Sequence, residues 1–291
     1  MDNNCFSLMT FPFGLDLFFK RLRIIDLFRL ADSFGIPYVD VMNIPEKKVS
    51  QYRNAIDATG VAVYCYIASV SFFSHKDKLE SRLRNSIKTA KALGARMLMI
   101  VPYVGMRDLK SAQKMGKESV QKLLINGFRL ATALGAHYAI PVCFEITPHD
   151  EICLSGAKDC KLVLDAVPDL GLVFDTANML PAGDVPVETY DILRSRICHV
   201  HLKDVSLSTG RFARKFSEHT HEGRNMHCVV WGEGIIPVNE LMEKMKQDGY
   251  PGVYAIEYVH PTGLVCGMKK HTDQLCKFTH CIKNSNRTPF L

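Results

Sequence analysis

The segment Ile197-Cys198-His199-Val200-His201-Leu202-Lys203-Asp204 decides how the whole chain is interpreted. It has the length and apolar content of a buried strand. Successive side chains alternate across a strand, so Val200 and Leu202 face one side and the two histidines and the lysine face the other. An ordinary core strand would carry apolar side chains on both faces. We therefore expect a strand that lies between an apolar layer and a polar site.

Three other predicted strands end in an isolated acid: Val142-Cys143-Phe144-Glu145, Leu172-Val173-Phe174-Asp175 and Tyr254-Ala255-Ile256-Glu257. Any one of these acids could be an ordinary salt-bridge partner for a neighbouring loop. Four strand ends that carry Glu145, Asp175, His201 and Glu257 are harder to explain in that way. We take them as a candidate site.

The chain alternates strand and helix eight times, with strand ends near residues 11, 42, 70, 102, 145, 175, 201 and 257. One helix is expected from Leu15 to Phe34 and a last one from Lys269 to Ile282. Consecutive βα units favour an α/β fold, a closed (β/α)8 TIM barrel that forms a single domain over residues 1–291. No GxGxxG motif follows the first strand, which argues against a dinucleotide-binding fold.

Two intervals between predicted strands are longer than the others, so extra loops are expected near residues 103–117 and 205–230. The second is rich in Ser, His, Arg and Gly and lacks an apolar period. We interpret it as a lid-like insertion over the barrel mouth. The polar end of the chain, residues 283–291, is expected to be a loose tail.

The composition is that of a globular protein, with 47% apolar and 23% charged residues. No apolar run is long enough to span a bilayer, and the N-terminus lacks the basic flank of a signal peptide. The ten cysteines show no CxxC spacing, so buried reduced thiols are favoured over disulfides or a zinc finger. We expect a cytoplasmic protein without membrane contact.

The net charge of +6 is modest, and basic residues gather locally at Arg211, Arg214, Lys215 and Arg224. A solvated loop is the simpler interpretation, while attraction of an anionic substrate such as a sugar phosphate is the functional one. Aromatic residues are not interleaved there, so no nucleic-acid partner is expected.

The strand ends of a barrel that carry the active site are the C-terminal ones. Three carboxylates at that face would repel one another unless a cation lay among them. Three carboxylates and one imidazole form a hard donor set, which suits Mn²⁺ or Mg²⁺ and also admits Co²⁺ or Zn²⁺. The pattern predicts one divalent metal ion, with Mn²⁺ favoured.

The chain resembles the xylose isomerase-like TIM-barrel superfamily, the sugar phosphate isomerase/epimerase group that includes inosose dehydratases and ketose epimerases. The resemblance rests on these segments: Cys143-Phe144-Glu145, Val173-Phe174-Asp175-Thr176-Ala177-Asn178, His199-Val200-His201-Leu202-Lys203-Asp204, Trp231-Gly232-Glu233-Gly234 and Gly249-Tyr250-Pro251-Gly252 leading to Ile256-Glu257.

The resemblance implies that Glu145, Asp175, His201 and Glu257 bind the metal and that Glu145 and Glu257 act as catalytic acid and base. The implied substrate is a small carbohydrate, isomerised or epimerised by proton transfer through an enediolate. An inosose dehydratase-like lyase is the nearest alternative. An endonuclease IV-like nuclease needs further histidines, and a degenerate ligand-binding barrel would not need the four-residue set. The sequence does not determine whether the protein forms a homo-oligomer.

Three further residues are candidates for substrate binding: Asn178, Lys203 and Trp231. Asn178 stands where many relatives carry His; it can hydrogen-bond a substrate oxygen but cannot transfer a proton. Lys203 is expected either to bind substrate or to pair with a carboxylate. Trp231 is expected either to wall the sugar site or to pack in the core. His199, one layer deeper, is expected to be a hydrogen-bonded core histidine.

Overall fold

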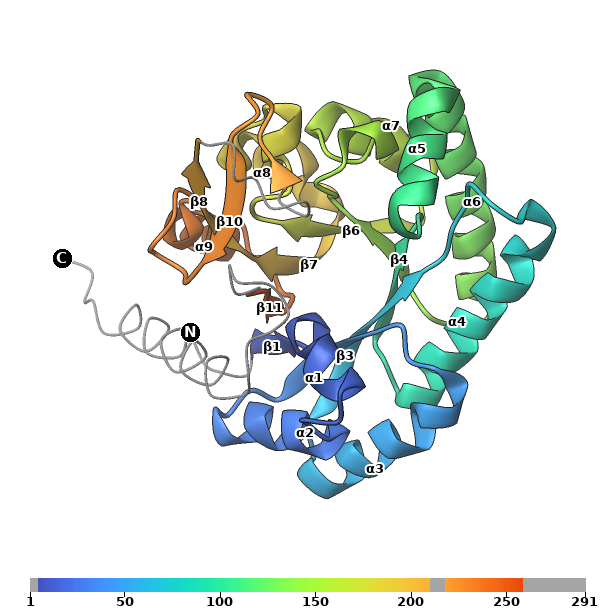
Figure 1. Cartoon of the computed structure of the whole chain (residues 1–291), viewed down its shortest axis with the longest axis vertical. Coiled ribbons are helices and arrows are strands. Elements are labelled where there is room, and N and C mark those ends of the chain that lie inside the picture. Colours follow the sequence, from blue (N-terminus) through green and yellow to red (C-terminus); the bar gives the residue numbers. More distant parts are fainter. Residues whose placement is uncertain (1–4, 210–217, 259–291) are drawn as a thin grey trace.

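The computed structural model describes residues 5–209 and 218–258, in which eight parallel strands close into a barrel surrounded by helices (Figure 1). The strands follow one another around the barrel in the order β1-β11-β7-β6-β5-β4-β3-β2. Their bounds are β1 Phe6–Met9, β2 Tyr38–Met42, β3 Ala62–Ser69, β4 Met97–Val101, β5 Val142–Glu145, β6 Leu170–Asp175, β7 Ile197–Leu202 and β11 Tyr254–Ile256. The predicted (β/α)8 TIM barrel is confirmed.

The helices alternate with these strands and cover the outside of the barrel. Their bounds are α1 Gly14–Phe18, α2 Ile24–Ser33, α3 Val49–Thr59, α4 Leu79–Leu93, α5 Gly105–Met115, α6 Lys117–His137, α7 Ala157–Ala166, α8 Pro186–Leu193 and α9 Val238–Gln247. Helices α3 and α4 end at Gly60 and Gly94, whose φ angles of 74° and 69° lie in the left-handed region that favours glycine. These glycines turn the chain back toward the next strand.

Two apolar layers hold the barrel together, one between strands and helices and one inside the barrel. Along β5, Phe144 belongs to the outer layer and Cys143 to the inner one. Along β6, Phe174 and Val173 divide in the same way. Full burial of one such apolar side chain stabilises a fold by roughly 1.5–3 kcal/mol. The strict alternation leaves the inward side of each strand end free to carry a polar side chain.

The single helix expected from Leu15 to Phe34 is two helices, α1 and α2. The backbone oxygen of Asp16 accepts hydrogen bonds from the amides of Arg21 and Leu22, at 2.8 and 3.2 Å, and so closes the first helix. The second begins after Arg23, whose guanidinium and backbone amide both bind the Asp26 carboxylate. Apolar spacing alone did not reveal this break.

The extra loop expected near residues 103–117 is helix α5. The carboxylate of Asp108 accepts a hydrogen bond from the Val104 amide at 2.7 Å and satisfies one of the free donors of the helix start. Leu109 and Ala112 are the buried side of the helix. This apolar face is too narrow for the periodicity to stand out in the sequence.

The insertion expected as a loop over residues 205–230 contains an antiparallel three-stranded sheet. Its strands are β8 Asp204–Ser208, β9 Glu218–His219 and β10 Asn225–Val229, in the order β8-β10-β9. The sheet starts at the C-terminal end of β7, and the amide of His221 donates to the Leu180 carbonyl at 3.1 Å in the segment after β6. Such short strands gave no period in the sequence, and a lid role stays a prediction.

The predicted helix from Lys269 to Ile282, the tail over residues 283–291 and the basic residues Arg211, Arg214 and Lys215 lie outside the described residues. Among the helices described, none combines the length and apolar character that crossing a membrane requires.

Candidate metal centre and active site

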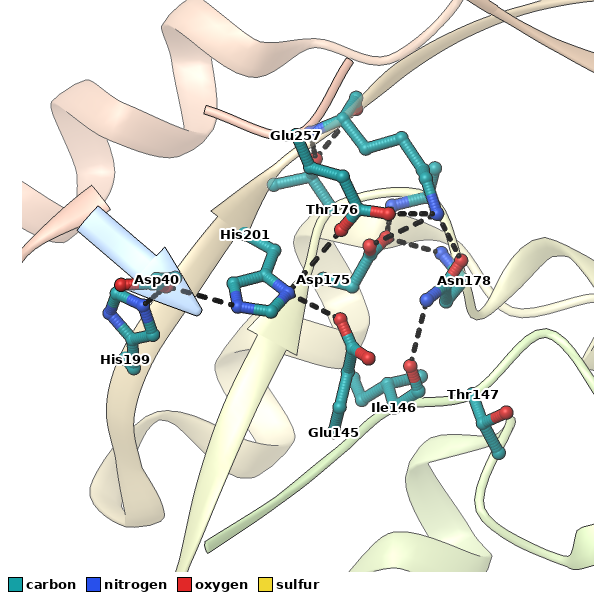
Figure 2. Close-up of polar contacts among 12 residues, drawn as sticks. Asp40, Glu145, Ile146, Thr147, Asp175, Thr176, Asn178, His199, His201 and Glu257 are labelled. Atoms are coloured by element: carbon teal, nitrogen blue, oxygen red, sulfur yellow. Dashed lines mark hydrogen bonds and ion pairs between the residues drawn. The ribbon is translucent and has the colours of Figure 1, made fainter. Parts of the chain in front are cut away.

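Glu145, Asp175, His201 and Glu257 converge at the C-terminal mouth of the barrel (Figure 2). Glu145 and Asp175 are the last residues of β5 and β6. His201 is the second-to-last residue of β7, and Glu257 directly follows β11. Each offers one ligand atom, and these four atoms all lie within 4.8 Å of one another. The structure thus brings together the four residues that the sequence analysis selected.

The two glutamates approach the same ring nitrogen of His201. Its Nδ1 lies 2.5 Å from Oε1 of Glu145 and 3.3 Å from Oε2 of Glu257. The side chains of His201 and Asp175 are fully buried, whereas those of Glu257 and Glu145 are 10% and 18% exposed. The two glutamates therefore form the accessible side of the cluster.

Unsatisfied buried atoms show that this cluster fits a cation. Oδ1 of Asp175 accepts the amides of Ala177 and Asn178, both at 2.8 Å, while its Oδ2 has no hydrogen-bond partner. Oε2 of Glu257 is also buried without a hydrogen bond, and its nearest charged neighbour is Nδ1 of His201 at 3.3 Å. Buried carboxylate oxygens normally find a partner, and a hard divalent ion would be one here.

Lys203 supplies the cluster with a positive charge. Its Nζ lies 3.0 Å from Oε1 of Glu257 and 3.4 Å from Oδ2 of Asp175. Burial alone would lower the pKa of Lys203, but the two carboxylates outweigh it and hold that pKa well above its usual range. Burial would raise the pKa of Glu257, yet Lys203 and His201 bring it well below its usual range. Glu257 is therefore ionised.

Asp175 and His201 carry the protons of the metal-free cluster. Burial, with repulsion from Glu257 and Glu145, raises the pKa of Asp175 to about 8 although Lys203 acts in the opposite direction. Burial would lower the pKa of His201, but the charge of Glu145 and the hydrogen bonds that the protonated ring donates to neighbouring carboxylates raise it well above its usual range. The cluster thus reduces its excess negative charge by binding protons.

Asn178 links the segment after β5 to Lys203 by hydrogen bonds. Its Nδ2 donates to the Ile146 carbonyl at 2.9 Å, and its Oδ1 accepts from Nζ of Lys203 at 3.0 Å. Thr176 adds a second link, since its hydroxyl donates to the Lys203 carbonyl and accepts from the Lys203 amide. Asn178 therefore orients Lys203, and its contact with substrate stays a prediction.

Trp231 is 5% exposed and belongs to the apolar core. The Gly-Glu-Gly segment that follows it is held by Asp204, whose carboxylate accepts the amides of Gly232 and Gly234 at 2.9 Å and of Ile236 at 3.1 Å. Packing is the observed role of Trp231, and a role as a wall of the sugar site stays a prediction.

The sequence analysis missed Asp40, which lies beneath the cluster on β2. Its Oδ2 is 2.6 Å from Nε2 of His199 and 3.7 Å from Nε2 of His201. The signal was present: Asp40 interrupts the apolar strand Tyr38–Met42 at an inward position, as the four selected residues do on theirs. His199 is a fully buried, hydrogen-bonded histidine as expected, with Nδ1 2.9 Å from the Val253 carbonyl.

A family model described as xylose isomerase-like TIM barrel matches residues 28–278. The chain belongs to this family. It is also similar to an inosose isomerase of Halalkalibacterium halodurans, with 25% identity over 200 residues. That match covers 65% of this chain and 64% of the relative's own length.

Several solved structures share the fold of this chain. The probable 3-DHS dehydratase AsbF of Bacillus anthracis superposes with a TM-score of 0.74 at 17% identity, covering 96% of this chain and 98% of that one. The IolI protein, solved with a bound zinc atom, superposes with a TM-score of 0.72 at 16% identity, covering 98% and 99%. At these identities the likeness shows the architecture alone.

Proposed function

We propose that this chain is a divalent-metal-dependent isomerase or epimerase acting beside the carbonyl of a sugar, a sugar phosphate or a polyol-derived ketone. One observation carries the proposal. Glu145, at the end of β5, and Glu257, directly after β11, reach the same nitrogen of His201 (Figure 2). This arrangement gives one ligand cluster two carboxylates that can exchange protons with a bound molecule.

The ion is proposed to be bound by Glu145, Asp175, His201 and Glu257, with Mn²⁺ favoured by the oxygen-rich donor set. The zinc atom in the IolI structure supports a divalent ion in a protein of this fold. The inosose isomerase similarity supports a cyclic polyol ketone as one substrate class. Both observations concern similar proteins, so the native metal and substrate of this chain are to be determined by experiment.

A bound divalent ion would act as a Lewis acid that makes the C–H bond beside a carbonyl easier to deprotonate. The chain itself supplies the proton-transfer groups. Glu257, ionised beside Lys203, takes the proton, and Glu145, the more exposed of the two glutamates, lies on the other side of the cluster to return one that it has exchanged with solvent. Lys203 keeps Glu257 ionised and in place.

A dehydratase is the second candidate, and the position of Lys203 favours it. Its ammonium group lies beside Glu257, where its charge would stabilise a departing hydroxyl oxygen. The similarity to AsbF agrees with this reaction class. A nuclease of the endonuclease IV type is less supported, because β2 and β3 end in Met42 and Ser69 where further metal-binding histidines would be needed.

The experiment is a substrate screen in deuterium oxide. The purified protein is stripped of metal with a chelator and reconstituted separately with Mn²⁺, Mg²⁺, Co²⁺ or Zn²⁺. Ketoses, sugar phosphates and inososes are then followed by NMR and mass spectrometry. Metal-dependent deuterium incorporation beside the carbonyl supports an isomerase or epimerase, and loss of water supports the dehydratase. Conversion that is independent of metal, or no conversion of any compound, contradicts the proposal.

A further inference from the structure

Asp40 and His199 form a fully buried pair one layer beneath the proposed metal ligands (Figure 2). They come from β2 and β7, which are separated around the barrel by β1 and β11, so their contact crosses the barrel interior. Neither residue reaches solvent or the rim of the site. The proposed reaction, as described above, assigns them no role.

Asp40 is held in place from two sides. Its backbone oxygen accepts hydrogen bonds from the amide and the hydroxyl of Thr10, at 2.9 and 2.8 Å. Its Oδ2 lies 2.6 Å from Nε2 of His199, whose Nδ1 is in turn 2.9 Å from the Val253 carbonyl. The ring of Tyr64 lies against His199 with a centroid separation of 4.9 Å. The carboxylate therefore has a fixed position in the barrel interior.

The same Oδ2 faces His201. It lies 3.7 Å from Nε2 of that ring, and this nitrogen is buried without a hydrogen-bond partner. A neutral imidazole can offer Nδ1 to a metal only when its other nitrogen carries the proton, and that buried N–H then needs an acceptor. Asp40 is the acceptor that the structure places on the Nε2 side.

We infer that Asp40 is a positioning residue that binds the Nε2–H of His201 and so presents Nδ1 to the ion, while His199 holds Asp40 in place. The inference rests on the proposed function, in that it takes Nδ1 of His201 as a metal ligand. The 3.7 Å separation is too long for a hydrogen bond. Glu145 lies 2.5 Å from Nδ1, and the inference requires the ring to tilt toward Asp40 when Nδ1 binds an ion in place of Glu145.

A second metal site is the competing explanation, because Asp40, His199 and His201 also offer three ligand atoms within 4.8 Å of one another. The hydrogen bonds of His199 argue against it. Both of its ring nitrogens already face oxygen atoms, those of Asp40 and of the Val253 carbonyl. The positioning role keeps both contacts of His199. A second ion would have to break the closer one, between Nε2 of His199 and Asp40.

The test uses the full-length protein loaded with Zn²⁺, whose closed shell permits NMR of isotope-labelled histidine. In the wild type, Nδ1 of His201 should be metal-bound and Nε2 should carry a slowly exchanging, hydrogen-bonded proton. Asp40→Asn should make that proton exchange faster and weaken Zn²⁺ and Mn²⁺ binding by about 10–100-fold, the usual effect of losing such a partner. The matched control is Asp159→Asn, a buried carboxylate on α7 that binds Gln121 and Lys117.

The control should alter thermal stability without changing metal affinity or the His201 signals. Should Asp40→Asn fold poorly, His199→Gln keeps an N–H donor near Asp40 but loses the ring's contact with the Val253 carbonyl, so Asp40 is held less firmly. Metal binding should weaken by up to about tenfold, with faster exchange of the Nε2 proton. Metal affinity equal to wild type in the folded variant, or two bound ions per wild-type chain, overturns the inference. Failure of the wild type to bind any divalent ion would instead reject the proposed function.

Discussion

Lys203 lies closer to Glu257 than to Asp175, with Nζ–O distances of 3.0 and 3.4 Å. The closer contact helps to keep Glu257 charged, while burial acts most strongly on Asp175. Glu257 keeps its charge, and Asp175, whose pKa is raised to about 8 by burial and by repulsion from its carboxylate neighbours, is protonated near neutral pH. A divalent ion must therefore displace protons to bind.

Metal affinity should rise steeply with pH. Asp175 and His201 both hold a proton in the metal-free protein, and both must lose it to bind an ion. Below about pH 8 each proton released makes the affinity about tenfold stronger per pH unit. Calorimetric titration of Mn²⁺ in buffers of different ionisation enthalpy should show about two protons released near pH 7. Affinity that does not change between about pH 6 and pH 8 would contradict this charge balance.

Replacing Lys203 with Met should destabilise the metal-free protein. The ammonium is 5% exposed, and its loss leaves the buried Glu257 carboxylate without its closest counter-charge. Removing one partner of a buried ion pair costs about 3–5 kcal/mol of unfolding free energy. Denaturant unfolding should reveal this loss, and Mn²⁺ should restore more stability to the variant than to the wild type. Lys161→Met, which breaks an exposed pair with Asp165, serves as control and should change stability by less than about 1 kcal/mol.

Glu257→Gln should separate metal binding from proton transfer. Gln has nearly the same shape and keeps one oxygen for the ion, but it cannot accept and return a proton. Turnover of a substrate identified by the screen should fall by roughly 10²–10⁴-fold and stay low at saturating Mn²⁺. Asp175→Asn, a proposed ligand without a proton-transfer role, should regain most of its rate as Mn²⁺ is raised. Full recovery of Glu257→Gln at high metal would leave Glu257 as a ligand alone.

The part of the insertion that contains β9, between β8 and β10, is predicted to act as a lid for the substrate. Replacing residues 209–224 with a short Gly-Ser linker keeps β8, β10 and the Asp204 contacts that hold the 232–236 turn. We expect a folded protein with unchanged metal affinity and a KM raised by at least about tenfold. An unchanged KM would argue against a lid, as would an unfolded product.

The barrel and the four-residue cluster could be predicted because they rest on local patterns. An acid at the inward end of an apolar strand, as in Phe144-Glu145 and Phe174-Asp175, is visible in the sequence, and barrel geometry then gathers such ends at one mouth. Contacts across the barrel have no such signal. The approach of Asp40 to His199 joins residues 159 positions apart and depends on how the strands tilt and close.

The elements that the sequence analysis predicted wrongly also depend on contacts set by the tertiary fold. Helix α5 has a narrow buried face and a start fixed by Asp108 with the Val104 amide, and the strands of the sheet β8-β10-β9 are short and depend on pairing with one another. The sequence also did not indicate that Asn178 and Thr176 would be used to orient Lys203. Composition identifies such residues as polar and loop-forming, while their partners are set by the tertiary fold.

A crystal structure of the Mn²⁺-loaded protein, with the ion located by anomalous scattering, tests the central claim most directly. The account predicts one ion with an oxygen or nitrogen atom of Glu145, Asp175, His201 and Glu257 each within about 2.0–2.3 Å, the His201 ligand being Nδ1. An ion bound elsewhere, with these four side chains directed to separate places, would contradict it.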